Sequence, residues 1–257
     1  MMRRSVGINA WSALGGQLCR QDRMRLMGQV MLTRLAAVSG RLQRGLGIEP
    51  ARLSQVDLQA IRLPDSSVAV KASELASELC EPWLFNHCMR TYMWGAMLAQ
   101  VNRIKFDEEL FFTASILHDL GLTSTHLCRD ASCSCFAVEG ARAARQFVST
   151  QGWTNQRCDQ LAEAISLHLN VRVGLHHGAE AHLLHAGTSL DLIGAGARQL
   201  DAGAVNHVLG AYPKLSLKTS MVQAMKGQAR ARPASRAAFL VGLGFIGMLR
   251  AADAGLE

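Results

Sequence analysis

The feature that most constrains the fold is the spacing of the apolar residues. From Pro82 onward they recur at intervals of three and four in one segment after another, and strand-like alternation is nowhere sustained. This periodicity predicts helices over residues 83–101, 107–120, 138–151, 155–169 and 183–200. A preceding helix, through Val68 and Leu79, would begin at Asp65 or Ser66, because either side chain can cap a helix N-terminus. The chain is therefore predicted to be all-α.

Length and composition indicate a globular protein with a sizeable core. The chain has 257 residues, of which 49% are hydrophobic, enough for one large domain or two small ones. Its sole long uncharged apolar stretch, residues 237–249, has thirteen residues, whereas a membrane-spanning helix needs roughly 20. We predict that this stretch is a buried helix and that the chain has no integral membrane segment.

The net charge of +7 is concentrated at the N-terminus. Residues 1–50 carry eight arginines against Asp22 and Glu49. A helix is predicted over residues 21–46, with a basic face opposite an apolar one formed by Met24, Met27, Val30, Met31 and Leu35. We expect this helix to pack on the domain; an arm that binds a membrane surface or a partner is the alternative. Aromatic residues are only 5% of the chain, which does not favour nucleic acid as a partner.

These patterns divide the chain into three parts. We expect a basic N-terminal arm over residues 1–58, a main domain over 59–235 and an apolar C-terminal helix over 236–257 that packs on the domain. Seven cysteines without regular spacing fit reduced thiols better than a disulfide framework. No clear signal peptide precedes the domain, so a cytoplasmic location is expected. A homo-oligomer is an open alternative to a monomer.

The strongest local motif is His118-Asp119, at the end of an apolar helix and followed by Gly121. Consecutive helical residues point about 100° apart, so an adjacent imidazole and carboxylate can both reach one ion held beside the helix axis. Other helices would have to supply the remaining ligands. One such pair proves little by itself.

Two further ionisable residues lie in apolar runs. His87 comes 31 residues before His118, and Asp191 comes 72 residues after Asp119. A buried, unpaired carboxylate such as Asp191 is costly, so an arginine, a helix terminus or a cation must compensate it. Taken singly, each of these residues is more simply a satisfied core histidine or a capping aspartate.

The order His, His-Asp, Asp on successive helices resembles the HD superfamily of metal-dependent hydrolases. Within it, the chain is most similar to the cyanamide-hydratase-like branch over residues 59–235. The segments that carry this resemblance are Leu63-Pro64-Asp65-Ser66, Leu84-Phe85-Asn86-His87, Ile116-Leu117-His118-Asp119-Leu120-Gly121-Leu122-Thr123, Phe136-Ala137-Val138-Glu139-Gly140-Ala141, Ala164-Ile165-Ser166-Leu167-His168, Leu190-Asp191-Leu192-Ile193-Gly194, Tyr212-Pro213 and Lys218.

The resemblance implies an all-helical HD-domain bundle with a divalent metal. Its ligands would be His87, His118, Asp119 and Asp191. Zinc is favoured, although iron, manganese or nickel also suits a mixed nitrogen and oxygen ligand set. HD enzymes with two metals draw extra histidines from the region before the last aspartate. His168 and His176, or His177 in place of His176, are therefore candidates for a second metal or for polarising the substrate.

The same resemblance suggests a reaction. A divalent ion lowers the pKa of a bound water to near 7, so the site would deliver hydroxide. Phosphate-cleaving HD enzymes commonly place Lys or Glu where this chain has Leu122, and that apolar residue favours a small neutral substrate. The prediction is hydration of a nitrile-type molecule, with cyanamide to urea as the concrete case. Asp119 would accept a proton, Thr123 and Asn86 would orient the substrate, and Lys218 would lie near the mouth.

Two alternatives stay open. One is a phosphohydrolase acting on a nucleotide or phosphomonoester, with Arg90 and Arg172 binding phosphate. The other is a binding module without enzymatic activity, stabilised by metal and steered by the basic N-terminal arm. The first predicts activity on phosphate esters and none on cyanamide, and the second predicts neither.

Overall fold

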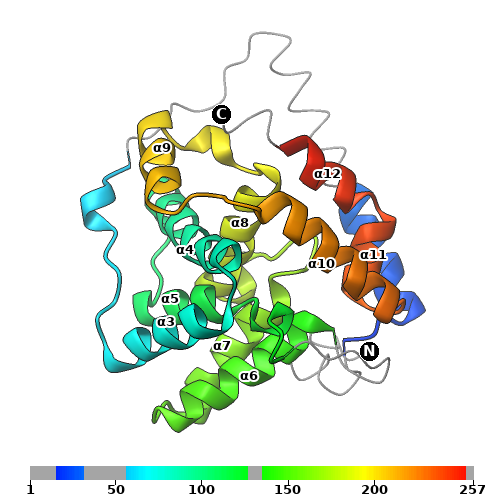
Figure 1. The fold of residues 1–257 in the computed structure, drawn as a ribbon, viewed down its shortest axis with the longest axis horizontal. Coiled ribbons are helices and arrows are strands. Elements are labelled where there is room, and N and C mark those ends of the chain that lie inside the picture. Colours follow the sequence, from blue (N-terminus) through cyan, green and yellow to red (C-terminus); the bar gives the residue numbers. More distant parts are fainter. Residues whose placement is uncertain (1–15, 32–55, 127–134, 253–257) are drawn as a thin grey trace.

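The computed structural model describes residues 16–31, 56–126 and 135–252, and within these residues it is built of helices without a named strand (Figure 1). The predicted all-α class is confirmed for this part of the chain. The main helices are α3 (Ser67–Leu79), α4 (Pro82–Asn102), α5 (Glu108–Leu117), α6 (Phe136–Thr150), α7 (Asn155–Leu167), α8 (Ala179–Ile193), α9 (Ala202–Ala211), α10 (Leu217–Ala231), α11 (Arg236–Gly242) and α12 (Phe245–Ala251). Short 3-10 turns occupy η1 (Leu58–Ala60), η2 (Leu120–Leu122), η3 (Leu175–His177) and η4 (Ala197–Gln199).

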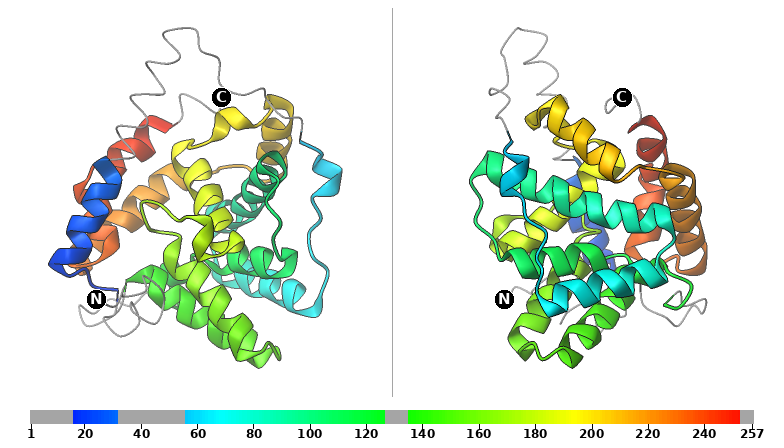
Figure 2. Two further views of the ribbon diagram at one scale, coloured as in Figure 1. Left: turned by 180° about the vertical axis from the view of Figure 1, so that it is seen from behind. Right: turned by 60° about the vertical axis from the view of Figure 1, so that its left-hand side comes forward.

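Helices α4, α5, α7 and α8 form the centre of the bundle. Each of α4, α5 and α7 packs against α8, and α5 also packs against α4 and α7. Helix α3 covers α5, and α6 lies along α7 at one end of the molecule (Figures 1 and 2). The central four helices carry most of the fully buried apolar side chains, so they form a rigid frame for polar groups placed among them.

A glycine sets the close approach of α4 and α8. A Cβ atom at Gly187 of α8 would collide with the carbonyl oxygen of Thr91 in α4. The two backbones therefore touch at this point, and any larger residue would push them apart. This contact fixes the register between α4 and α8, and so determines which residues in the N-terminal half of α4 face the C-terminal end of α8.

Most predicted helix boundaries in the main domain lie within a few residues of those observed. Ser66, and not Asp65, caps α3, since its Oγ accepts a bond from the Ala69 amide. The predicted helix over 183–200 is wrong at both ends. Helix α8 begins earlier, after Gly178, and stops at Gly194, whose backbone is left-handed with φ of 68°.

The prediction of one buried C-terminal helix is also wrong. Residues 237–249 form parts of two short helices, α11 and α12, that are separated at Gly244, where φ is +91°. Only a few of their side chains are buried, and Met248 is 47% exposed. Both helices pack on α10, and α12 also contacts α8. The apolar run is therefore a cover over the bundle and not part of its centre.

The N-terminal segment lies against this cover, as expected for a helix packed on the domain. Residues 20–31 are helical, and the Leu18 amide donates to the carbonyl oxygen of Ala234. The predicted apolar face is largely exposed, with Met24, Met27 and Met31 at 76%, 39% and 61%, whereas the enclosed side chain is that of Leu26, which was not among its predicted members. The remainder of the predicted helix, with Leu35, lies outside the described residues. Within the described parts, every helix is too short or too polar to cross a bilayer.

Candidate metal centre

The candidate metal centre lies where the ends of several helices meet inside the bundle. His87 is in the second turn of α4, and Asp191 is in the last turn of α8. His118 caps the C-terminus of α5, Asp119 follows it at the start of η2, and His168 caps the C-terminus of α7. Helix ends expose their backbone carbonyl groups to side chains, and the site uses two of them.

All three imidazoles are oriented by their Nδ1 atoms. Nδ1 of His87 lies 2.6 Å from Asp191 Oδ2. Nδ1 of His118 lies 2.7 Å from Ser115 O, and Nδ1 of His168 lies 2.6 Å from Ile165 O. A carbonyl or carboxylate oxygen only accepts, so each Nδ1 donates a proton, and in the neutral ring Nε2 then carries the lone pair. Histidines that bind metals are held in this way by an acceptor on the opposite ring nitrogen.

The three Nε2 atoms surround one carboxylate. Nε2 of His118 is 3.3 Å and Nε2 of His87 is 3.7 Å from Oδ2 of Asp119, while Nε2 of His168 is 3.6 Å from its Oδ1. His87 and His118 are fully buried, and Asp119 and His168 are 2% and 4% exposed. Water therefore solvates this carboxylate very little, so the charge that stabilises it must come from the groups around it.

This arrangement fits a cation. Nε2 of His87 and Nε2 of His118 are buried and have no hydrogen-bonding partner. The ligand atoms of His87, His118 and Asp119 all lie within 4.8 Å of one another, and this group could hold a metal ion. Unpaired buried acceptors around a carboxylate are costly without a positive charge between them, and ligand bonds of about 2 Å to one ion would remove that cost.

Asp191 belongs to the same cluster but lies behind His87. Besides binding His87 through Oδ2, it accepts two bonds from Arg90, Nε to Oδ1 at 2.7 Å and Nη2 to Oδ2 at 2.9 Å. Oδ1 also accepts from Trp94 Nε1 at 2.8 Å. Four hydrogen bonds from three side chains thus occupy both oxygens. Asp191 orients His87 and balances the charge of Arg90, where the sequence predicted a direct metal ligand.

The pKa shifts follow from burial and from these contacts. Burial raises the pKa of Asp119, but the histidines around it, His118 first, bring it well below its ordinary value. Asp191 is likewise held ionised against burial by His87 and Arg90, with a lowered pKa. Burial lowers the pKa of His118, and Asp119 more than compensates, so the net direction is upward. Burial and His118 lower the pKa of His168 to about 3.

The other residues predicted for the site have hydrogen-bonding partners or neighbours of their own. His176 lies on η3, exposed and beside His177, whereas His168 is next to Asp119. The Thr123 hydroxyl donates to Leu120 O at 2.7 Å, and Asn86 Nδ2 donates to Pro213 O at 2.9 Å. Lys218 lines a cavity of about 260 Å³ together with Lys214 and Asp191.

Sequence reasoning missed the roles of Arg90 and Trp94. Arg90 was considered only for phosphate, yet its guanidinium is fully buried and also donates to the carbonyl oxygens of Tyr212 and Pro213. Both residues lie on the face of α4 that carries His87, three and seven positions further along. An arginine one turn beyond a histidine in an apolar helix was the available signal.

Over the residues that the structure describes, the chain is an all-helical bundle with a buried His-His-Asp group that could hold a metal ion. Comparison with models of protein families and with curated protein sequences finds no match to this chain. The resemblance to the HD superfamily therefore rests on the sequence motifs alone.

Acid should destabilise the metal-free protein through His168. Its folded pKa of about 3 lies below the value of 6.5 for the unfolded chain, so the unfolded state binds more protons between these pH values. Stability is then lost as pH falls, by up to about 1.4 kcal/mol per pH unit. The pKa of His185 is also lowered, so His185 likewise makes the folded state less stable as the pH falls. Asp119 and Asp191 lose their contribution to folding stability only below about pH 4.

Urea unfolding of metal-free protein between pH 6 and pH 4.5 measures this slope. His118, with a raised pKa, loses its stabilising contribution only as pH rises above 6.5, so it does not affect this window. We expect His168→Gln to reduce the slope by about one proton per chain. An unchanged slope in the variant would show that His168 is not held neutral.

Proposed function

We propose that this chain is a metal-dependent hydratase or hydrolase of the HD superfamily, which adds water to a small neutral nitrile-type substrate. The observation that carries the proposal is the set of Nε2 atoms around Asp119, two of which are buried without a hydrogen-bonding partner. When bound, a divalent cation would supply a water that ionises near neutral pH and a Lewis acid for the substrate. Zinc is the favoured ion, because nitrogen and carboxylate ligands suit it.

The ligands that we propose are His87, His118 and Asp119. His168 is within reach as a fourth, and its low pKa keeps it neutral at pH 7, with Nε2 available to a cation or to the hydrogen of a water. Asp191 acts through His87: it holds the Nδ1 proton and so directs Nε2 toward the site. Asp119 remains the predicted proton acceptor. The Thr123 oxygen can still accept a bond, so its predicted role in orienting the substrate stays a prediction.

A neutral substrate is favoured over a phosphate ester by the contacts of Arg90. Its guanidinium is already engaged by Asp191 and by two backbone carbonyl groups. Binding a phosphate there would require breaking a buried ion pair, which is expensive. Arg172, the other arginine considered for phosphate, is exposed on the loop after α7.

One observation favours the runner-up, a phosphohydrolase. Lys214 and Lys218 line the cavity that Asp191 also borders, and two ammonium groups could attract an anionic ester. In that case the ester would lie beside α10 and α12, which line this cavity through Leu217 and Leu249.

Turnover assays distinguish the hydratase from the phosphohydrolase. The purified protein is loaded in turn with zinc, manganese, iron and nickel. We expect conversion of cyanamide or a simple nitrile to the corresponding urea or amide, and its loss in Asp119→Ala. Activity on p-nitrophenyl phosphate with none on any nitrile would establish the runner-up. Equal hydration by the parent and by Asp119→Ala would refute the assigned site.

A further inference from the structure

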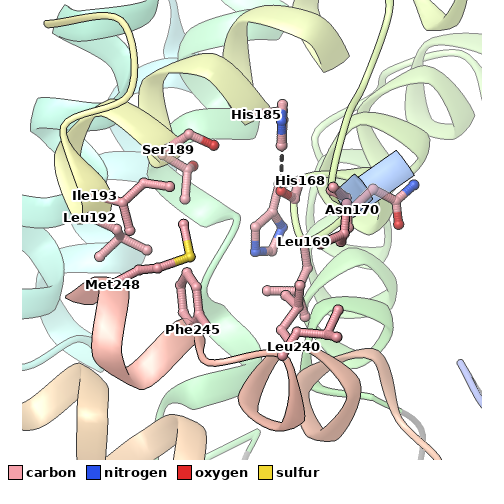
Figure 3. Close-up of a pocket in the computed structure, with 14 residues that line it drawn as sticks. His168, Leu169, Asn170, His185, Ser189, Leu192, Ile193, Leu240, Phe245 and Met248 are labelled. Atoms are coloured by element: carbon pink, nitrogen blue, oxygen red, sulfur yellow. Dashed lines mark hydrogen bonds between the residues drawn. The ribbon is translucent and has the colours of Figure 1, made fainter. Parts of the chain in front are cut away.

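A second cavity borders the metal centre at His168. It has a volume of about 180 Å³ and opens between α8, the loop after α7 and the cover formed by α11 and α12 (Figure 3). Most of its wall is apolar, and the apolar residues that matter here are Val30, Leu192, Ile193, Leu240, Phe245 and Met248. In Figure 3, the His168 imidazole points toward the space between Leu240, Phe245 and Met248.

His168 belongs to both the cavity and the centre. Its ring lines the cavity, while its Nε2 faces Asp119 Oδ1 at 3.6 Å. The ring is oriented by its Nδ1, which donates to Ile165 O, and the backbone carbonyl of His168 accepts from His185 Nδ1 at 3.0 Å (Figure 3). A molecule in this cavity therefore lies one imidazole away from the proposed ligands.

The polar groups of the cavity carry no permanent charge. Among the described residues, no Asp, Glu, Lys or Arg lines the wall, and its polar side chains are those of Asn170, Thr188, Ser189 and the two histidines His168 and His185. Thr188 lines the cavity, is 7% exposed, and has a hydroxyl without a hydrogen-bonding partner. An unsatisfied buried hydroxyl is unfavourable and would gain from a polar group on a ligand.

We propose that this cavity binds the apolar part of the substrate, so that the natural substrate is an alkyl nitrile or a similar neutral molecule with one short aliphatic chain, and not cyanamide. The identity of the reactive nitrile group rests on the proposed hydration. The binding of the substrate's carbon chain rests on the cavity alone. The head would lie toward Thr188 and His168, and the chain against Leu240, Phe245 and Met248. Cyanamide has no carbon chain and would leave these apolar walls without a partner.

The volume limits the size of the chain. Pockets for drug-sized ligands span roughly 300–1,000 Å³, so a cavity of about 180 Å³ suits a molecule of only a few carbons. Each methylene taken from water into the cavity should tighten binding about fourfold, the equivalent of about 0.8 kcal/mol. The gain should stop once the cavity is full.

The test is a chain-length series from acetonitrile to hexanenitrile, together with cyanamide. Dissociation constants are measured by ligand-observed NMR on the full chain, both as the metal-loaded parent and as Asp119→Ala, and turnover is measured in parallel on the parent. We expect the constants to fall about fourfold per methylene and then to level off. Met248→Trp, which fills the cavity from α12, should stop the gain at a shorter chain.

Val70→Trp is the matched control. Val70 is 45% exposed on α3, away from the cavity, so the same side chain placed there should leave the series unchanged. Constants that do not vary with chain length, or equal behaviour of Met248→Trp and the parent, would overturn the proposal even if cyanamide is hydrated. A chain-length dependence that Met248→Trp shortens, without turnover of any nitrile, would uphold the cavity and reject the hydration.

Discussion

His118→Ala is expected to abolish stoichiometric metal binding. The substitution removes Nε2 of His118, a buried atom that lies 3.3 Å from Asp119 Oδ2 and has no hydrogen-bonding partner. Loss of an outer partner of a ligand already costs about 10- to 100-fold in metal affinity, so loss of the ligand should cost more than that. Metal content per chain, measured by mass spectrometry after dialysis against trace zinc, reports the effect.

His207→Ala is the matched control, since His207 lies on α9 and has no part in the cluster. It should retain the metal content of the parent. If His118→Ala also retained it after the same dialysis, the ion would have to be held by other residues. The assignment of the buried group would then be wrong.

Arg90→Ala is expected to lower the free energy of unfolding far more than the surface substitution Arg145→Ala. It leaves the Asp191 carboxylate buried with two of its hydrogen bonds removed. Breaking a buried ion pair from one side costs about 3–5 kcal/mol, because the other charge stays uncompensated. Urea unfolding of the metal-free variant measures the loss, and weaker zinc binding should accompany it, because Asp191 holds His87.

Arg145→Ala is the comparison for this effect. Arg145 pairs with Asp159 at 2.7 Å, but both side chains are exposed, at 37% and 54%. Such a surface pair contributes about 0–1 kcal/mol. If Arg90→Ala lost no more stability than Arg145→Ala, the buried network around Asp191 could not have the charge balance described.

Much of the cluster could be predicted because its residues are spaced along separate helices with strong apolar periodicity. The pairing of His118 with Asp119 at a helix end, and the placement of His87 in an apolar segment, led to residues that the structure brings together. The all-α class followed from the same periodicity, since spacings of three and four cannot form a strand face.

The position of Asp191 could not be predicted in the same way. A carboxylate on α8 can face an ion or an arginine, and the outcome depends on how far α8 slides along α4. That register is set by the close backbone contact at Gly187, which no local pattern reveals. The sequence did predict that a buried Asp191 needs an arginine, a helix terminus or a cation, and in the structure Arg90 meets this need.

The histidines after α7 show a similar limit. His168 and His176 both precede Asp191 and could not be ranked by position, yet only His168 is buried and adjacent to Asp119. Burial depends on which side of the loop faces α5 and α8. The C-terminal prediction failed for a different reason, because a single glycine with positive φ divides an apolar run that composition alone describes as one helix.

The most direct test of the account is anomalous diffraction from crystals of the zinc-loaded protein. We predict one strong peak at about 2.0–2.2 Å from Nε2 of His87, Nε2 of His118 and a carboxylate oxygen of Asp119, with Asp191 still bound to Arg90. A peak at another place in the molecule, or none at a saturating zinc concentration, would contradict the account.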